Sequence, residues 1–134
     1  MFSLFKKDAS QPRKDWPWAL TMGPILGVRK NPGWSNIENG LKALIQDGDS
    51  FLILEQKDPA NPKRYWFIQS AIALQGPHQG EYTLEIGYKG ENGAGRLLDR
   101  TFPHLEDLFP WYEAAFAAKK LDLSGFDDMS DMVQ

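Results

Sequence analysis

The middle of the chain carries three strand patterns in succession, and this run restricts the fold more than any other feature. Residues 50–56 form a short apolar run, typical of a strand buried on both faces. Over 64–74 and 81–89 the side chains divide into two faces at a period of two, as strand geometry requires. Only the proline-containing loop 57–63 and the turn 75–80 connect these patterns. Connections this short join antiparallel neighbours, so the sequence predicts a β-meander.

Helical patterns lie on both sides of the predicted strands. Ser35 stands three residues before Glu38, which is the capping-box spacing, and an apolar stripe at helical period follows it. This pattern predicts a helix over 35–47. A second apolar stripe predicts a helix over 104–120, which Pro110 should kink or split. We therefore expect an α+β fold, with an antiparallel meander sheet of three to five strands flanked by helices before and after it.

The remaining segments fill in a single domain over residues 1–134. Glycine and proline interrupt the apolar run 19–30, which predicts irregular structure or a short strand. A flexible glycine loop precedes a fourth strand candidate at 96–102. Segments 1–15 and 121–134 are expected to be mobile, or to dock only against a partner. The residues expected in the core are Leu41, Leu44, Leu52, Leu54, Trp66, Ile68, Leu84, Ile86, Leu108 and Tyr112.

Composition excludes several function classes. The formal net charge of −3 at pH 7 argues against a nucleic-acid binder, which normally carries a basic excess. The chain has no cysteine, so it forms no disulfide or thiolate metal site, and this suits a reducing cytoplasm. No stretch approaches the roughly 18 apolar residues of a membrane span. We expect a cytoplasmic protein that binds neither nucleic acid nor a membrane.

The sequence contains no recognisable catalytic motif. His78 stands in a glycine–proline turn and His104 precedes a helical pattern, and neither belongs to a metal-binding spacing. Ser50, Ser70 and Thr83 fall in strand patterns, outside the motif of a nucleophile elbow. We therefore expect a protein that is not an enzyme and that carries neither a cofactor nor a metal.

Two sets of residues are candidates for binding a protein partner. Outward-facing carboxylates on one strand and in the acidic tail would suit a basic partner, although such groups also serve simply to keep a surface solvated. Aromatic residues would instead supply a compact energetic hot spot. The acidic candidates are Glu81, Glu85, Asp127, Asp128 and Asp131, and the aromatic candidates are Tyr65, Phe67 and Trp111.

Three segments carry a family resemblance: Gly48–Glu55, Arg64–Gln69 and Tyr82–Ile86. Together they resemble the strand core of two groups of small bacterial proteins. One is the type III secretion chaperone-like group. The other comprises immunity proteins encoded beside polymorphic or contact-dependent toxins. The resemblance implies a helix–meander–helix α+β fold and a protein-binding role, and it assigns no binding residues.

The favoured hypothesis is an immunity protein that neutralises a cognate bacterial toxin, such as a nuclease, by stoichiometric binding as a monomer or homodimer. The alternative is a chaperone-like escort for a secreted effector. A small enzyme of unknown type is the third. The mild acidic excess is compatible with the first hypothesis, because a nuclease needs a positive surface to hold phosphate.

Overall fold

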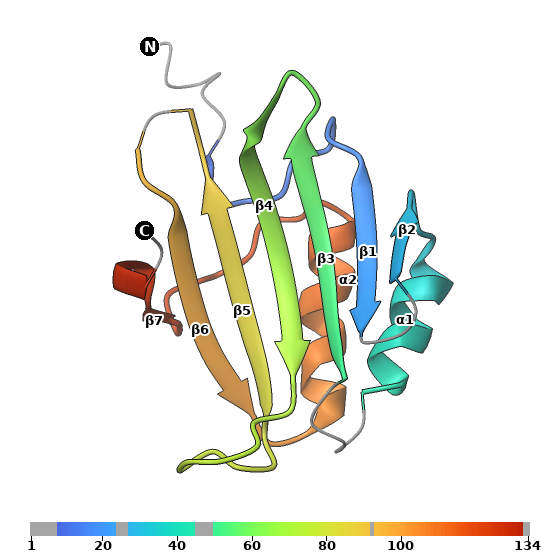
Figure 1. The fold of residues 1–134 in the computed structure, drawn as a ribbon, viewed down its shortest axis with the longest axis vertical. Helices are drawn as coiled ribbons and strands as arrows, with labels where there is room; N and C mark the ends of the chain where they lie inside the picture. Colours follow the sequence, from blue (N-terminus) through green and yellow to red (C-terminus); the bar gives the residue numbers. More distant parts are fainter. Residues whose placement is uncertain (1–7, 24–26, 45–49, 92, 133–134) are drawn as a thin grey trace.

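The structure is a computed structural model that describes residues 8–23, 27–44, 50–91 and 93–132. It is an α+β fold with a single seven-stranded antiparallel sheet, and both α-helices pack on the same face of that sheet (Figure 1). The α+β class is confirmed. The expected number of strands was too low, and the first helix follows two strands of the sheet rather than preceding the sheet.

Neighbours in the sheet are mostly neighbours in the chain. The strand order is β2-β1-β3-β4-β5-β6-β7, so only β1 departs from sequence order, by lying between β2 and β3. Every pairing is antiparallel. The strands are β1 (Trp18–Gly23), β2 (Gly27–Lys30), β3 (Phe51–Asp58), β4 (Asn61–Ala71), β5 (Tyr82–Lys89), β6 (Arg96–Phe102) and β7 (Asp127–Asp128).

The segment 19–30 was expected to be irregular with a possible short strand, and it contributes two paired strands instead. Gly23 ends β1, and Gly27 begins β2 with φ at +67°, a backbone conformation that glycine adopts at little cost. The glycines therefore stand at the strand ends rather than within a broken run. Leu20 at the centre of β1 is fully buried, as a residue of a sheet core should be.

The segment 57–63 also differs, since most of it is strand rather than loop. β3 continues to Asp58 and β4 begins at Asn61, with a register shift between Lys57 and Asp58. Pro62 lies inside β4 at a position where the pairing with β5 has not yet begun. A proline without an amide hydrogen is tolerated there because that edge of the strand has no partner in the ladder.

The first helix is shorter than predicted. α1 spans Trp34–Lys42, and residues 45–47 of the predicted helix lie outside the described residues. Its N-terminal cap is Gly33 instead of Ser35, and the Asn36 side chain accepts a 2.9 Å hydrogen bond from the Gly33 amide. The capping role passes to Asn36 because the helix begins one residue earlier than the predicted pattern.

The second helical pattern is split next to Pro110, as predicted, but its helix ends at Phe116 rather than continuing to residue 120. A 3₁₀ turn, η2 (Leu105–Leu108), leads directly into α2 (Phe109–Phe116), and Pro110 stands in the first turn of α2. Proline suits that position because the first amides of a helix have no partner within it. No helix in the described part of the chain is long and apolar enough to cross a membrane.

The core lies between the sheet and the two helices. All of the side chains expected in it are buried, with Leu44 at 4% exposure and the others at 0%, so that prediction is confirmed. Trp66 of β4 contributes the largest fully buried side chain, and its ring meets Trp18 edge-on at 5.9 Å between centroids. Burial on one face of the sheet therefore accounts for the alternation along β3 and along the central parts of β4 and β5.

The described parts of both predicted mobile segments contact the rest of the domain. The indole Nε1–H of Trp66 donates a 2.9 Å hydrogen bond to the Ser10 carbonyl. The Gln11 side chain accepts a 2.6 Å hydrogen bond from the Leu121 amide and donates a 3.1 Å bond to the Leu121 carbonyl. Further along, β7 pairs with β6. Residues 8–15 and 121–132 thus touch the sheet and each other, while 1–7, 133 and 134 lie outside the described residues.

Candidate functional site

One face of the sheet has no described element over it (Figure 1). Directly paired residues of antiparallel strands point to the same face, so the strand register defines this open face. Its members are Val28 and Lys30 of β2, Ala19, Thr21 and Gly23 of β1, Phe51, Ile53, Glu55 and Lys57 of β3, Tyr65, Phe67, Gln69 and Ala71 of β4, Thr83, Glu85, Gly87 and Lys89 of β5, Leu97, Asp99 and Thr101 of β6, and Asp127 of β7.

A row of three carboxylates crosses the open face. Glu85 of β5 is paired directly with Asp99 of β6, and Asp99 is paired directly with Asp127 of β7. Like charges at directly opposed positions destabilise a sheet. At the inner end of this acidic row, the Gln69 amide donates a 2.5 Å hydrogen bond to Glu85. The register therefore concentrates negative charge on one half of the open face.

Asp99 lies at the middle of the acidic row, between Glu85 and Asp127. Burial raises its pKa above the ordinary value of 3.8, a backbone hydrogen bond from Arg100 opposes that shift, and the nearby charge of Asp127 adds to it. Its Oδ1 atom is buried and has no hydrogen-bond partner among the described residues. A cation that approaches from outside would stabilise the ionised form of this carboxylate.

The open face also carries three aromatic residues, Phe51 on β3 and the neighbours Tyr65 and Phe67 on β4, which together are called the aromatic patch. A Cβ atom on Gly87 would stand 2.2 Å from Phe67 Cζ, and one on Gly23 would stand 1.7 Å from Phe51 Cε2. Both rings therefore occupy space over a glycine of the neighbouring strand. Tyr65 and Phe67 stack at 6.0 Å between centroids. The patch presents half-buried rings to solvent without projecting far from the sheet.

Among the described residues, two hollows on the open face bear on partner binding. One, of about 250 Å³, is lined by Phe51 and Ile53 on one side and by Gln69 and Glu85 on the other, so it joins the aromatic patch to the acidic row. The second, of about 490 Å³, lies over β1, β2 and β3, where Val28 is 64% exposed. The open face therefore carries apolar side chains together with carboxylates, a combination suited to another protein.

The structure brings together four of the eight predicted binding residues on the open face: Glu85, Asp127, Tyr65 and Phe67. Glu81 stands just before β5, where its carboxylate lies 3.0 Å from Nδ1 of His78. Glu81 therefore lies at the edge of the open face, where β5 meets the preceding turn.

The other three predicted binding residues lie elsewhere. Asp128 forms an ion pair with Arg96, and Asp131 is in the 3₁₀ turn η3 (Ser130–Met132). Trp111 is on α2, across the sheet from the open face, where it packs edge-on against Phe126 at 5.2 Å between centroids. These positions place the three side chains outside the cluster of Glu85, Asp127, Tyr65 and Phe67.

Sequence reasoning missed Asp99, Phe51 and Ile53. Asp99 falls in the predicted strand 96–102, but its importance arises only from its alignment with Glu85 and Asp127. Phe51 and Ile53 lie in an apolar run that reads as a strand buried on both faces, whereas the structure leaves them half-buried on the open face. The sequence does not reveal that no helix covers this face of β3.

The described residues contain no group of three or more histidine or acidic side chains arranged to hold a metal ion, and the acidic row is included in that statement. Its carboxylates stand at directly paired positions on three neighbouring strands. The open face can thus attract cationic groups and bury apolar ones.

No protein-family model, curated protein or solved structure matches this chain. The geometry of the open face is therefore the basis for a functional proposal.

Proposed function

We propose that this chain acts by binding a basic protein partner through the open face. The acidic row is the observation that supports the proposal. Three directly aligned carboxylates cost the isolated fold stability, and Asp99 has a buried oxygen with no hydrogen-bond partner among the described residues. Lysine or arginine side chains from a partner would offset that cost by pairing with the row.

The aromatic patch supplies the apolar part of the same interface. Binding energy usually concentrates in a few aromatic or arginine residues near the centre of an interface, surrounded by groups that exclude water. Phe51 and Glu85 both line the hollow of about 250 Å³, so a partner side chain entering it would contact an aromatic ring and a carboxylate. This combination favours a partner that presents apolar groups together with cations.

The biological role that we infer for this binding is neutralisation of a cognate bacterial toxin by stoichiometric binding. A toxin that acts on nucleic acid needs a positive surface to hold phosphate, and an acidic sheet face can occupy that surface. The resemblance to immunity proteins points in the same direction. An escort protein for secretion would use the same face, but it would release its partner intact.

The test uses the product of the neighbouring gene as the partner. The key variant is the triple substitution Glu85→Gln, Asp99→Asn and Asp127→Asn. Its matched control, Glu106→Gln, Glu113→Gln and Asp122→Asn, removes the same charge from exposed positions outside the open face. We expect wild-type association to slow as the Debye length shrinks towards about 8 Å at physiological salt. We expect the key variant, and not the control, to associate at least about tenfold more slowly at low salt.

Two outcomes separate the parts of this proposal. A folded key variant that associates as fast as wild type would show that the acidic row does not bind the partner. A complex that forms normally but leaves the partner toxic to cells would rule out neutralisation while preserving partner binding. Secretion of the partner only when the chain is co-expressed would indicate the escort role instead.

A further inference from the structure

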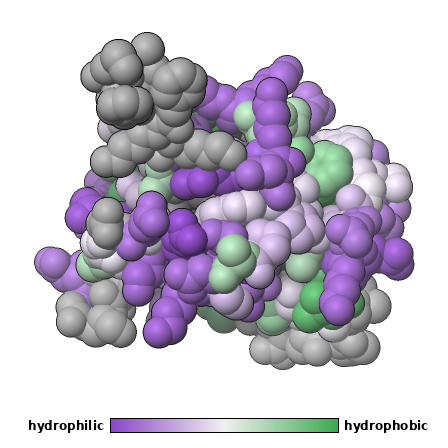
Figure 2. Space-filling model, turned by 90° about the horizontal axis from the view of Figure 1, so that it is seen from above, coloured by the Kyte–Doolittle hydropathy of each residue, from purple (hydrophilic) through white to green (hydrophobic). Residues whose placement is uncertain are grey.

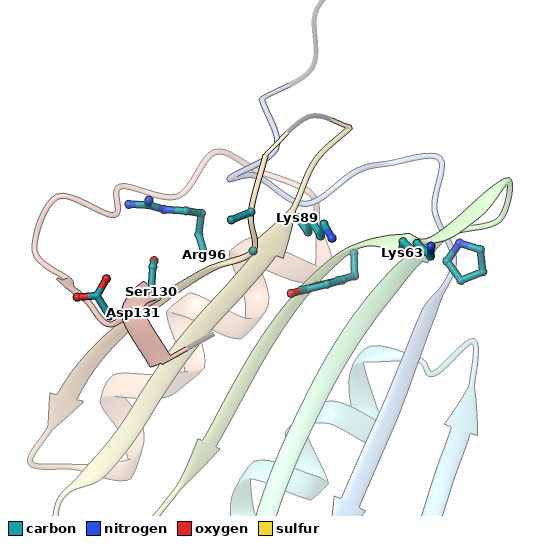
Figure 3. A pocket seen from close by; sticks show the side chains of 9 residues that line it. Lys63, Lys89, Arg96, Ser130 and Asp131 are labelled. Carbon is teal, nitrogen blue, oxygen red and sulfur yellow. The ribbon is translucent and has the colours of Figure 1, made fainter. Parts of the chain in front are cut away.

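A groove of about 680 Å³ lies at the end of the sheet, next to the tips of the β3–β4 and β5–β6 hairpins. Lys63 of β4 and Lys89 at the end of β5 approach it from the sheet, while Ser130 and Asp131 of η3 lie on its other side (Figure 3). The molecule viewed onto this end is mainly hydrophilic where residues are coloured (Figure 2). The groove is therefore a polar site, distinct from the hollow beside the acidic row.

The lining of the groove carries more positive than negative charge. It includes three cations, Lys63, Lys89 and Arg96, against one acid, Asp131. Arg96 is paired with Asp128, so its charge is partly neutralised. Neither Lys63 nor Lys89 forms an ion pair with another described residue. Two lysines thus remain available to a ligand.

The strand register fixes the position of Lys89. It is paired directly with Tyr65, whose ring forms part of the groove wall, and it is half-buried. Lys63 lies two residues before Tyr65 on β4, so its side chain points to the same face as Tyr65 and Lys89. Two strands therefore place two lysines next to Tyr65 on the same face of the sheet, and all three residues line the groove.

We propose that this groove binds a compact polyanion, a small ligand that carries two or more phosphate or carboxylate groups. The volume falls within the range of about 300–1,000 Å³ that is typical of small-molecule sites. Lys63 and Lys89 pair with the anionic groups, and the Tyr65 hydroxyl donates a hydrogen bond to one of them. The acidic row on the same face repels such a ligand, so the anion is confined to this end of the sheet.

The test is calorimetric titration of the whole chain, at low ionic strength, with inorganic pyrophosphate in one arm and citrate in the other. Lys63→Gln and Lys89→Gln should each weaken binding by about tenfold, which corresponds to one charge-assisted hydrogen bond. The matched control is Lys57→Gln. Lys57 is paired with Tyr65 from the opposite strand and lies outside the groove lining, so its loss should change affinity less than about twofold.

Amide chemical shifts locate the ligand independently of affinity. Bound probe should shift the amides of Gly95, Arg96 and Ser130, which line the groove, and leave those of α1 in place. Binding of citrate as well as pyrophosphate would assign the site to polyanions in general, and binding of pyrophosphate alone would assign it to phosphates. Binding of neither probe would overturn the proposal, as would equal weakening by the Lys57 and Lys89 substitutions.

Discussion

The hydroxyl of Tyr112 on α2 donates a 2.8 Å hydrogen bond to Oγ of Ser70 on β4, and both side chains are buried. This bond joins the helix layer to the centre of the sheet through the apolar core. Burial raises the pKa of Tyr112 far above its ordinary value, so the phenol remains a hydrogen-bond donor across the usual pH range. The net contribution of such a buried hydrogen bond to stability is modest, but leaving one of its polar groups buried without a partner is costly.

Removing either partner of this bond leaves the other unpaired, so the costs of the two single changes should overlap rather than add. We expect Tyr112→Phe to lower the free energy of unfolding by about 1–3 kcal/mol, because the Ser70 hydroxyl loses its buried partner. The double variant Tyr112→Phe/Ser70→Ala should lose less than the sum of the two single changes. Urea denaturation of all four proteins measures the coupling. A strictly additive double variant would show that the bond contributes nothing to stability.

Trp66 anchors both the core and the N-terminal segment. Because its side chain is fully buried, Trp66→Ala should cost about 3–5 kcal/mol of unfolding free energy. Trp66→Phe keeps a ring but removes the donor to the Ser10 carbonyl, so it should cost less than the alanine change. Trp34→Ala is the control, since Trp34 is only half-buried. Equal losses for Trp34→Ala and Trp66→Ala would contradict the packing described above.

The acidic row should make stability depend on pH in a particular direction. The folded-state pKa of Asp99 is raised above 3.8, so its stabilising contribution is present below that pH and is lost as pH rises through the folded pKa. At about pH 7, Asp99→Asn should therefore stabilise the fold, by about 0.2–1 kcal/mol, the span of cross-strand pair energies.

At about pH 3 the advantage of Asp99→Asn should vanish, because protonated Asp99 is then neutral in both the folded and unfolded states. Asp122→Asn is a useful comparison. Hydrogen bonds from Ser124 lower the pKa of Asp122, so the sign of the pH dependence is reversed there. Denaturant melts at the two pH values check both variants. A stabilisation by Asp99→Asn that persists in acid would have a cause other than charge.

The sequence predicted the meander and its buried face because both depend on local periodicity. Trp66, Ile68, Leu84 and Ile86 could be placed in the core from alternation alone, and all four are fully buried. Pro110 was read correctly for the same reason, since its effect on a helix is local.

The features that could not be predicted depend on partners distant in the sequence. The β1–β2 hairpin is stable because β1 pairs with β3, and local sequence patterns do not predict that pairing. The acidic row requires the register of three strands, and the tail strand β7 enters it only by pairing with β6. For the open face, alternation identifies two faces of a strand but does not say which of them a helix will cover.

The contact between Gln11 and Leu121 bears on how the chain folds and opens. The two residues are 110 positions apart, whereas the hairpins of the sheet join strands that are adjacent in sequence. Closing so long a loop costs more chain entropy than closing a hairpin. This contact should therefore form after the strands of the meander have paired. The reverse order applies to partial unfolding, in which the two outer segments detach together while the central strands stay paired. The Leu121 amide, bonded to the Gln11 side chain, should then exchange its hydrogen for deuterium well before the amides of β4.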